Sequence, residues 1–221
     1  MAVAYKSQGA GVATEASGGA LSPLCPATVD ANDILIAHCG YEGTTTTPDT
    51  PSGWTLLGGS PYTIDSAYRH WVFGKLADGT EDGAAVAFGT PAVTTVRTAR
   101  VYSFSGWVSG TITDNVPTAS FSHVSSAGTS VTFPTVTTTV TGALAIALIW
   151  EEDDNAQAAS TGESGGDWVE AVAEYVQAAT TPDTGMGIQT CTPTANPGTV
   201  SGGSITTAVN DAAGVIGFEI R

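Results

Sequence analysis

An acidic run is one place in this chain where neighbouring side chains could do chemistry together. Glu151, Glu152, Asp153 and Asp154 directly follow the apolar segment Ala143–Trp150. Carboxylates crowded into a loop repel one another, and a hard cation such as Ca²⁺ relieves that repulsion by binding them. The run lacks the alternating acidic spacing of a calcium-binding loop, and most such runs are solvated surface. Calcium at these four residues is therefore a candidate cofactor, and we expect no other.

Aromatic side chains offer a second chemistry, the stacking of sugar rings. The chain has five tryptophans, and an indole face suits the apolar face of a pyranose. Trp107 lies between glycines in Ser105–Gly110, which predicts an exposed loop, and Tyr41 ends a predicted strand. We take Trp107 and Tyr41 as candidate glycan-binding residues. The alternative interpretation is core packing, the usual role of aromatic residues in or beside strands.

A histidine and a serine raise the question of nucleophilic catalysis. The segments Ile36–Cys39 and Gly162–Gly166 resemble the histidine and nucleophile segments of chymotrypsin-like serine proteases. That resemblance implies His38 as the base for Ser164, two groups that acyl transfer would require within hydrogen-bond distance. However, no aspartate between them has a recognisable triad context. His38 also continues an alternating strand, so this is the least favoured hypothesis.

The three cysteines and the other two histidines are not spaced as the ligands of a metal site. Cys25, Cys39 and Cys191 are an odd number without the spacing of a metal site, although Cys25 and Cys39 are spaced much like the histidine-loop disulfide of the same proteases. We expect buried thiols in a protein made in a reducing compartment. His70 and His123 are isolated in the sequence and are assigned no chemistry.

Length and composition limit the class of protein. The chain has 221 residues, 42% of them apolar, and six basic against twenty-one acidic residues give a net charge of −15. So few cations argue against a nucleic-acid partner and against an anionic membrane surface. The longest apolar run, Ala143–Trp150, is far short of the roughly 20 residues that a spanning helix needs, so no membrane insertion is expected. The first residues predict no secretory signal.

The elements that must position these residues are predicted to be strands. Apolar residues recur at every second position in short runs that Gly, Pro, Asp or Asn bound. Only Asp167–Gln177 is ambiguous, because it also fits one face of a helix. Short strands at this spacing predict an all-β fold, a jelly-roll-like antiparallel β-sandwich. The predicted strands are Ala2–Gln8, Ile34–Tyr41, Ala67–Leu76, Ala84–Phe88, Thr98–Ser105, Ser130–Phe133, Ala143–Trp150, Gly185–Thr192, Ser204–Ala208 and Gly214–Ile220.

The two halves of the chain resemble each other in order. We therefore expect a single domain over residues 1–221, pseudo-duplicated from two four-stranded halves at about 26–107 and 135–221, each unable to bury its apolar face alone. The matching pairs are Asp33–Ala37 with Ala143–Ala147, Ser52–Trp54 with Gly166–Trp168, Tyr68–Leu76 with Gly185–Cys191, and Val101–Phe104 with Val215–Phe218.

Four short motifs in the first half carry a resemblance to a known group of proteins. They are Asn32–Ala37, Pro51–Leu57, Val72–Glu81 and Ala99–Gly106. In this order they resemble tailed-phage and prophage structural proteins, in which a Gly-Asp strand start, a Pro-x-Gly-Trp-Thr turn, a Lys-x-Ala-Asp-Gly-Thr-Glu turn and an aromatic strand ending in Ser-Gly follow one another. Asn32 stands where that group has glycine, and both residue types tolerate tight turns. The resemblance covers residues 26–107 and carries over no catalytic residue.

This resemblance implies a non-enzymatic structural protein of a tailed-phage virion, a decoration or fibre component of head or tail. Its partners would be other capsid or tail proteins, and docking on a symmetric particle implies a homo-oligomer such as a trimer. Its place would be the virion, assembled in the host bacterial cytoplasm. The alternative function is a glycan-binding adhesin or fibre tip that binds a host surface glycan, and the serine protease ranks third.

Overall fold

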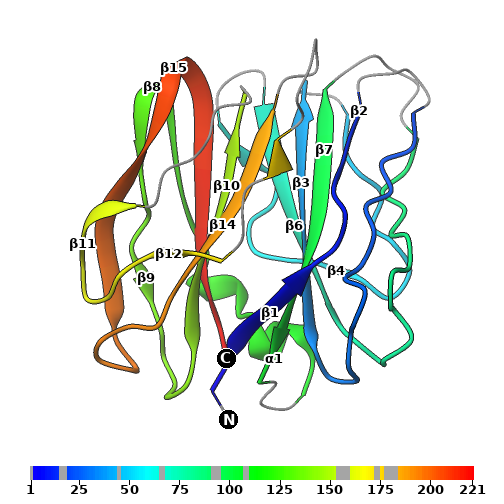
Figure 1. The fold of residues 1–221 in the computed structure, drawn as a ribbon, viewed down its shortest axis with the longest axis horizontal. Coiled ribbons are helices and arrows are strands. Elements are labelled where there is room, and N and C mark those ends of the chain that lie inside the picture. Colours follow the sequence, from blue (N-terminus) through cyan, green and yellow to red (C-terminus); the bar gives the residue numbers. More distant parts are fainter. Residues whose placement is uncertain are drawn as a thin grey trace.

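A computed structural model confirms the all-β fold. Strands hold 51% of the residues and helices 4%. Two antiparallel sheets face each other as the layers of a sandwich (Figure 1). Among the described residues, no helix has the length and apolar character needed to cross a bilayer. The structure describes residues 2–14, 19–43, 46–64, 68–90, 96–106, 110–152, 160–171, 175–176 and 184–221.

The first sheet is formed by the N-terminal half of the chain. Its strand order is β1-β7-β3-β6-β4, with β2 beside β7 and β5 beside β6. The central strand β3 pairs with β6 on one side and β7 on the other, so that Ile34 lies opposite both Leu76 and Phe104. The strands are β1 (Ala4–Gln8), β2 (Val12–Thr14), β3 (Ile34–Glu42), β4 (Thr55–Leu56), β5 (Tyr62–Thr63), β6 (Tyr68–Leu76) and β7 (Arg97–Ser105).

The second sheet is formed by the C-terminal half. Its strand order is β11-β15-β10-β14-β12, with β8 and β9 beside β15 and β13 beside β14. The central strand β10 pairs with β14 and β15. The strands are β8 (Ser122–Thr132), β9 (Val136–Thr137), β10 (Leu144–Glu151), β11 (Thr161–Ser164), β12 (Val169–Glu170), β13 (Tyr175–Val176), β14 (Gly185–Cys191) and β15 (Thr199–Ile220).

The segments that match in sequence occupy matching places in the two sheets. β3 and β10 are central, β6 and β14 flank them on one side, and β7 and β15 flank them on the other. Trp54 and Trp168 come directly before β4 and β12. Asn32 and Gly142, each two residues before a central strand, both have positive φ, 73° and 87°. Asn and Gly are the residues that adopt this left-handed backbone at least cost.

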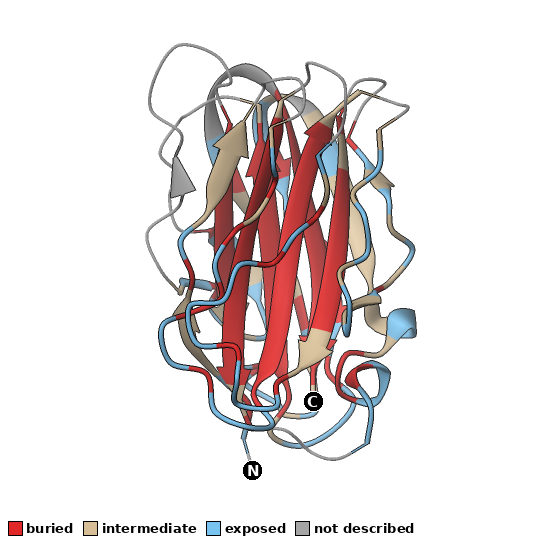
Figure 2. Cartoon of the chain, turned by 90° about the vertical axis from the view of Figure 1, so that its right-hand side faces the viewer, coloured by how far each residue is buried: buried red, intermediate tan, exposed pale blue. Residues whose placement is uncertain are grey.

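One apolar core lies between the sheets, and both halves contribute to it. Alternate residues of a strand point to opposite faces. Ile34 and Ile36 of β3 therefore share the inner face, where they belong to the same buried cluster as Ile146 and Leu148 of β10. The long strands of the sandwich are buried over most of their length (Figure 2).

The outer faces of both sheets are covered as well. On the first sheet, Leu35 and Ala37 pack in one cluster with Leu21 and Phe88, which come from the loops around the sheet. On the second sheet the cover is made of strands. β8 and β15 pair on both sides of a register shift between Thr206 and Asp211 (Figure 1). Val131 and Ile205, from the part of the pair that precedes this shift in β15, lie in one buried cluster with outer-face residues of β10 and so cover the sheet. The central strands are thus buried on both faces.

Two short helices lie at the same end of the sandwich as the chain termini (Figure 1). They are α1 (Ile112–Asn115) and the 3-10 helix η1 (Thr118–Ser120). Thr111 and Asp114 form a capping box that closes the first turn of α1. The backbone N–H of Arg221 donates to the Asn115 carbonyl at 2.8 Å, which fixes the end of β15 beside α1.

Several predicted elements differ from the structure. The ambiguous segment at 167–177 contains β12 and β13 and shows no helix among its described residues. Ala84–Phe88 is not a strand, since it makes only an isolated bridge between Ala85 and Leu24. The predicted Ser130–Phe133 strand is the end of the longer β8, and the last two predicted strands are parts of one strand, β15.

Candidate functional site

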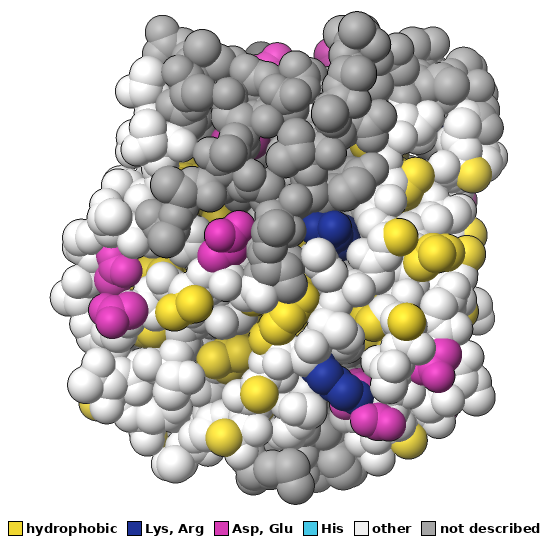
Figure 3. All heavy atoms as spheres, viewed as in Figure 1, with side chains coloured by type: hydrophobic (Ala, Val, Ile, Leu, Met, Phe, Trp, Pro, Cys, Tyr) yellow, Lys and Arg dark blue, Asp and Glu magenta, His cyan; other side chains and the backbone are white. Residues whose placement is uncertain are grey.

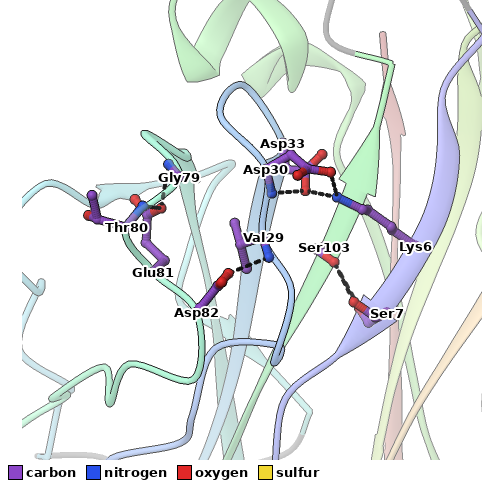
Figure 4. A network of polar contacts seen from close by, with 10 residues as sticks. All are labelled: Lys6, Ser7, Val29, Asp30, Asp33, Gly79, Thr80, Glu81, Asp82 and Ser103. Carbon is purple, nitrogen blue, oxygen red and sulfur yellow. Dashed lines mark hydrogen bonds and ion pairs between the residues drawn. The ribbon is translucent and has the colours of Figure 1, made fainter.

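The charged residues that precede β3 bind each other and the backbone (Figure 4). Asp33, which is buried, accepts hydrogen bonds from Lys6 Nζ at 2.5 Å and from the backbone N–H of Asp30 at 2.8 Å. Lys6 also donates to Asp30 at 2.6 Å. Asp82 accepts the backbone N–H of Val29 at 2.6 Å. These contacts tie the loop before the central strand to the edge strand β1 and to the turn after β6.

Glu81 holds the turn that follows β6. Its carboxylate accepts the backbone N–H groups of Asp78, Gly79 and Thr80 at 3.0–3.1 Å. It also pairs with Lys75 Nζ at 2.7 Å. Burial disfavours its charged form, but the contacts with Lys75 and with the backbone donors outweigh burial and hold the pKa of Glu81 below its ordinary value. The Lys-x-Ala-Asp-Gly-Thr-Glu motif is therefore a self-contained turn.

A groove of about 300 Å³ runs between this turn and the Pro-Ser-Gly-Trp turn, and we call it the Trp54 groove. The Trp54 ring is half-buried, with its edge toward Phe88 at 6.5 Å between ring centroids. Lys75 passes beside Gly53, whose φ is +79°, and so links the two turns. The groove-lining residues include Pro51, Ser52, Trp54, Lys75, Glu81 and Val86.

A second groove, of about 560 Å³, occupies the matching place on the second sheet, and we call it the acidic groove. Its carboxylates are Glu163 and Asp167, and three threonines also line it. Trp168, the counterpart of Trp54, is buried and does not line it. Burial, together with the charges of Asp167 and Glu163, raises the pKa of the Cys191 thiol to about 11. The two grooves therefore differ in their chemistry.

The glycan-binding prediction for Tyr41 is wrong. The Tyr41 side chain is fully buried on the outer face of the first sheet, where its ring packs edge to face with Trp71 at 5.3 Å between centroids. The alternation of β3 was correctly predicted, but the segment around Phe88 that covers this face was not. Trp107, the other candidate, lies outside the described residues.

The acidic run is divided between the core and residues outside the described ranges. Glu151 is buried at the end of β10. Glu152 accepts hydrogen bonds from the Tyr68 hydroxyl and from the backbone N–H of Ala212. Asp153 and Asp154 lie outside the described residues. Within the described part of the chain, no group of three or more His, Cys, Asp or Glu is arranged to hold a metal ion.

The pairing that a serine protease requires is not formed. His38 Nε2 lies 2.8 Å from His70 Nδ1 in the interior of the sandwich. Ser164 is exposed on β11, at the edge of the second sheet, with its hydroxyl 3.1 Å from that of Ser201. All three cysteines are free and buried, as predicted, so the Cys25–Cys39 disulfide of that resemblance is absent.

The three histidines of the chain meet between the two sheets, which the sequence analysis missed. His38 of β3 and His70 of β6 are fully buried, and His123 of β8 lies 6.4 Å from His70 between ring centroids. The rings of Trp150 and Tyr62 pack against His70 and His123 at 5.2 and 5.4 Å. We call His38, His70 and His123 the histidine cluster. His38 alternates along β3 with Ile34 and Ile36, and this spacing could have predicted that it shares their inner face.

Comparisons with known proteins add no relative. No family model matches the chain, no curated protein matches it, and no solved structure matches it.

Proposed function

We propose that this protein is a non-enzymatic structural component of a tailed-phage virion, a decoration or fibre component of head or tail. The observation that carries the proposal is that the charged side chains of the sequence motifs bind other groups of the same fold. Asp33 binds Lys6, Lys75 binds Glu81, and Glu81 binds three backbone N–H groups. Residues that lock turns are what a structural sandwich needs from its sequence, and the family resemblance rests on these same motifs.

Quantitative mass spectrometry of purified particles tests this proposal. Particles induced from the strain that carries the gene should contain the chain at a fixed number of copies. Hundreds of copies would place it on the head, and a handful would place it at the tail tip. If the chain is expressed in the lysing cells but absent from particles purified to constant composition, the proposal is wrong.

We also infer that the two halves arose by duplication and that the chain assembles as a homo-oligomer, with a trimer as the first candidate. The shared strand order of the sheets and the positive φ values of Asn32 and Gly142 support the duplication. A symmetric particle offers repeated identical docking sites, which favours cyclic oligomers of its surface proteins.

A second candidate function is glycan binding at the Trp54 groove. Trp54 combines a half-buried indole with fixed polar groups in one open groove, because Glu81 and Lys75 are held in place by the turn. An aromatic face beside hydrogen-bonding groups is the arrangement that suits a pyranose. The Lys75–Glu81 pair has no net charge, so a neutral sugar is the matching ligand class.

Titration with neutral methyl pyranosides tests the second candidate. Binding at Trp54 should shift its indole N–H resonance, and Trp54→Leu should abolish the interaction. Leu56→Ser is the matched control, because Leu56 is the exposed residue of the neighbouring strand β4. Unchanged indole resonances with methyl glucoside, galactoside and mannoside at about 50 mM, well above the millimolar dissociation constants of weak ligands, would contradict glycan binding here.

A further inference from the structure

The geometry of His38 and His70 fits a hydrogen bond between two neutral imidazole rings. The two ring planes lie 9° apart with centroids 5.0 Å apart, and the 2.8 Å Nε2–Nδ1 distance is shorter than any stacking contact. The rings therefore meet edge to edge. In a neutral imidazole one nitrogen donates and the other accepts, so a single N–H between the rings satisfies both facing atoms.

The far nitrogens of this pair have nothing to bind in the described part of the chain. His38 Nδ1 and His70 Nε2 are buried without a hydrogen-bond partner, and so is His123 Nε2. A proton added to either ring of the pair would place a charge, with an unpaired N–H, inside the apolar sandwich. The cost of burying such a charge is large, and a protein avoids it by staying neutral or by opening.

The surroundings of the cluster add no compensating carboxylate among the described residues. Arg100 of β7 stands opposite His38 in the strand register, so the group nearest in register already carries a positive charge. Trp150 of β10 contributes only an indole edge. Glu152, which follows β10, is bound to the Tyr68 hydroxyl, and Glu42, on the same face of β3 as His38, accepts the backbone N–H of Val96. The titratable and charged groups that share the inner face with the cluster or contact those that do are Glu42, Tyr62, Tyr68, Arg100, Tyr102 and Glu152.

We propose that the histidine cluster is an acid-sensitive latch in the interior of the sandwich: the fold stays closed while the rings are neutral and opens when protons bind. The proposal is independent of the virion hypothesis, since it follows from the interior alone. Burial lowers the pKa of His38 to about 3, and it lowers the pKa of His70 well below its ordinary value, with further contributions from His38 and His123. Burial also lowers the pKa of His123.

The sign and size of the effect follow from proton linkage. A histidine that stays neutral in the folded state but ionises near pH 6.5 when unfolded stabilises the fold fully above that pH, and its contribution is lost as the pH falls. The unfolded imidazole is already half protonated at pH 6.5, so each such residue lowers the folding equilibrium constant about fivefold between pH 6.5 and 5.5. His38 and His70 together therefore predict a loss of about 30-fold between pH 6.5 and 5.5. Carboxylates act below about pH 4.5, outside this window.

Urea unfolding of the full chain at pH 7.5, 6.5 and 5.5 tests the latch. The double variant His38→Gln/His70→Asn places amide atoms where the two bonded ring nitrogens lie, which keeps a hydrogen bond that cannot titrate. It should lose no more than about fivefold over the same interval, the most that the remaining His123 can contribute. His123→Gln is the matched control, because it removes the partly exposed histidine and should keep the loss of about 30-fold that His38 and His70 cause.

Two results would overturn the proposal. One is a wild-type folding constant that changes less than threefold between pH 6.5 and 5.5. The other is an equal loss in wild type and double variant. If the double variant does not fold, the imidazole carbon resonances of wild-type His38 and His70 decide the matter. They should keep their neutral positions until the protein unfolds, whereas native-state titration near pH 6.5 would rule the latch out.

Discussion

At Glu81 one carboxylate satisfies three backbone N–H groups and one ammonium group. The residue is largely buried, so losing its charge would leave those donors with weaker partners inside the turn. Asp33 plays the same part before β3 with Lys6 and Asp30. Single residues of the motifs thus have structural explanations that do not require a ligand.

Glu81→Gln should lower the free energy of unfolding by about 2–3 kcal/mol, because it removes the charge from hydrogen bonds of the strong, charge-assisted kind. Since the pKa of Glu81 is lowered in the fold, the stability it contributes is present above about pH 4.3 and is lost as the pH falls below that value. Urea unfolding at pH 7 measures the difference. Glu170→Gln on exposed β12 is the control, expected within about 0.5 kcal/mol of wild type. An equal loss in both variants would contradict the role given to Glu81.

Ser164 should not react with a fluorophosphonate probe, because His38 is paired with His70 in the interior and no base activates the serine hydroxyl. Mass spectrometry of the probe-treated protein checks this. A single covalent adduct at Ser164, lost in Ser164→Ala, would contradict the account.

The roles of single residues were harder to predict from the sequence than the strands or the fold. The sequence motif at Glu81 could be recognised, but its partner Lys75 and the surrounding donors become visible only in the folded turn. Tyr41 was wrongly expected to be accessible, because the sequence of β3 does not indicate that a distant segment covers the outer face of that strand. The histidine cluster was missed because His38, His70 and His123 lie on separate strands and converge only when the sheets pack.

At the scale of elements, β3 and β10 are the strands through which both halves of the chain contribute to one core. Each is central in its sheet and buried on both faces, with inner residues in the shared core and outer residues under a cover. Close packing leaves little room for added atoms on these strands. At Gly40 of β3, an added methyl group would lie 2.5 Å from Trp150 Cδ1 on the opposite sheet.

Gly40→Ala should therefore destabilise the protein by about 1–3 kcal/mol through overpacking between the sheets. Thermal or urea unfolding measures the loss. Gly128→Ala on β8 is the matched control, since its added methyl group would meet only Ser126 Oγ at 3.5 Å, and it should stay within about 0.5 kcal/mol of wild type. A wild-type stability for Gly40→Ala would mean that the sheets are less closely packed at Trp150 than described.

Six strands were predicted at nearly their observed bounds, including β1 and β14, whereas β8 and most short edge strands were not. β3, β6, β7 and β10 agree with the predictions to within about two residues, because their side chains alternate or are continuously apolar. Most of β8 was missed, since its Ser-, Gly- and Thr-rich sequence has no apolar period. The continuity of β15 was also missed, because it depends on pairing with β8 on both sides of the register shift.

At the scale of the molecule, two sheets of matching strand order enclose one core, and few large apolar residues of the described ranges are exposed. The exposed large apolar residues of the described ranges are Leu24, Leu56, Val140 and Val169, which come from separate segments. Figure 3 shows apolar side chains in small separate groups on the described part of one face. The described residues thus offer an oligomer polar surfaces and sheet edges as contacts.

Light scattering coupled to size exclusion should give a mass that is a multiple of 22.2 kDa, with three copies as the first expectation. Because the chain carries a net charge of −15, copies repel at low ionic strength, and the oligomer should be favoured by added salt. A constant monomer mass from low to physiological salt, at concentrations up to about 100 μM, would contradict the homo-oligomer; that ceiling corresponds to an association free energy near −5.5 kcal/mol.

The central proposal, a structural sandwich on the surface of a tailed-phage particle, is tested most directly by electron cryomicroscopy of particles from the source strain. The account predicts density for two facing antiparallel sheets at regular surface positions of head or tail, fitted by β3 and β10 as the central strands. Particles that are complete and infectious after deletion of the gene, and whose density maps match those of the parent at every surface position, would contradict it.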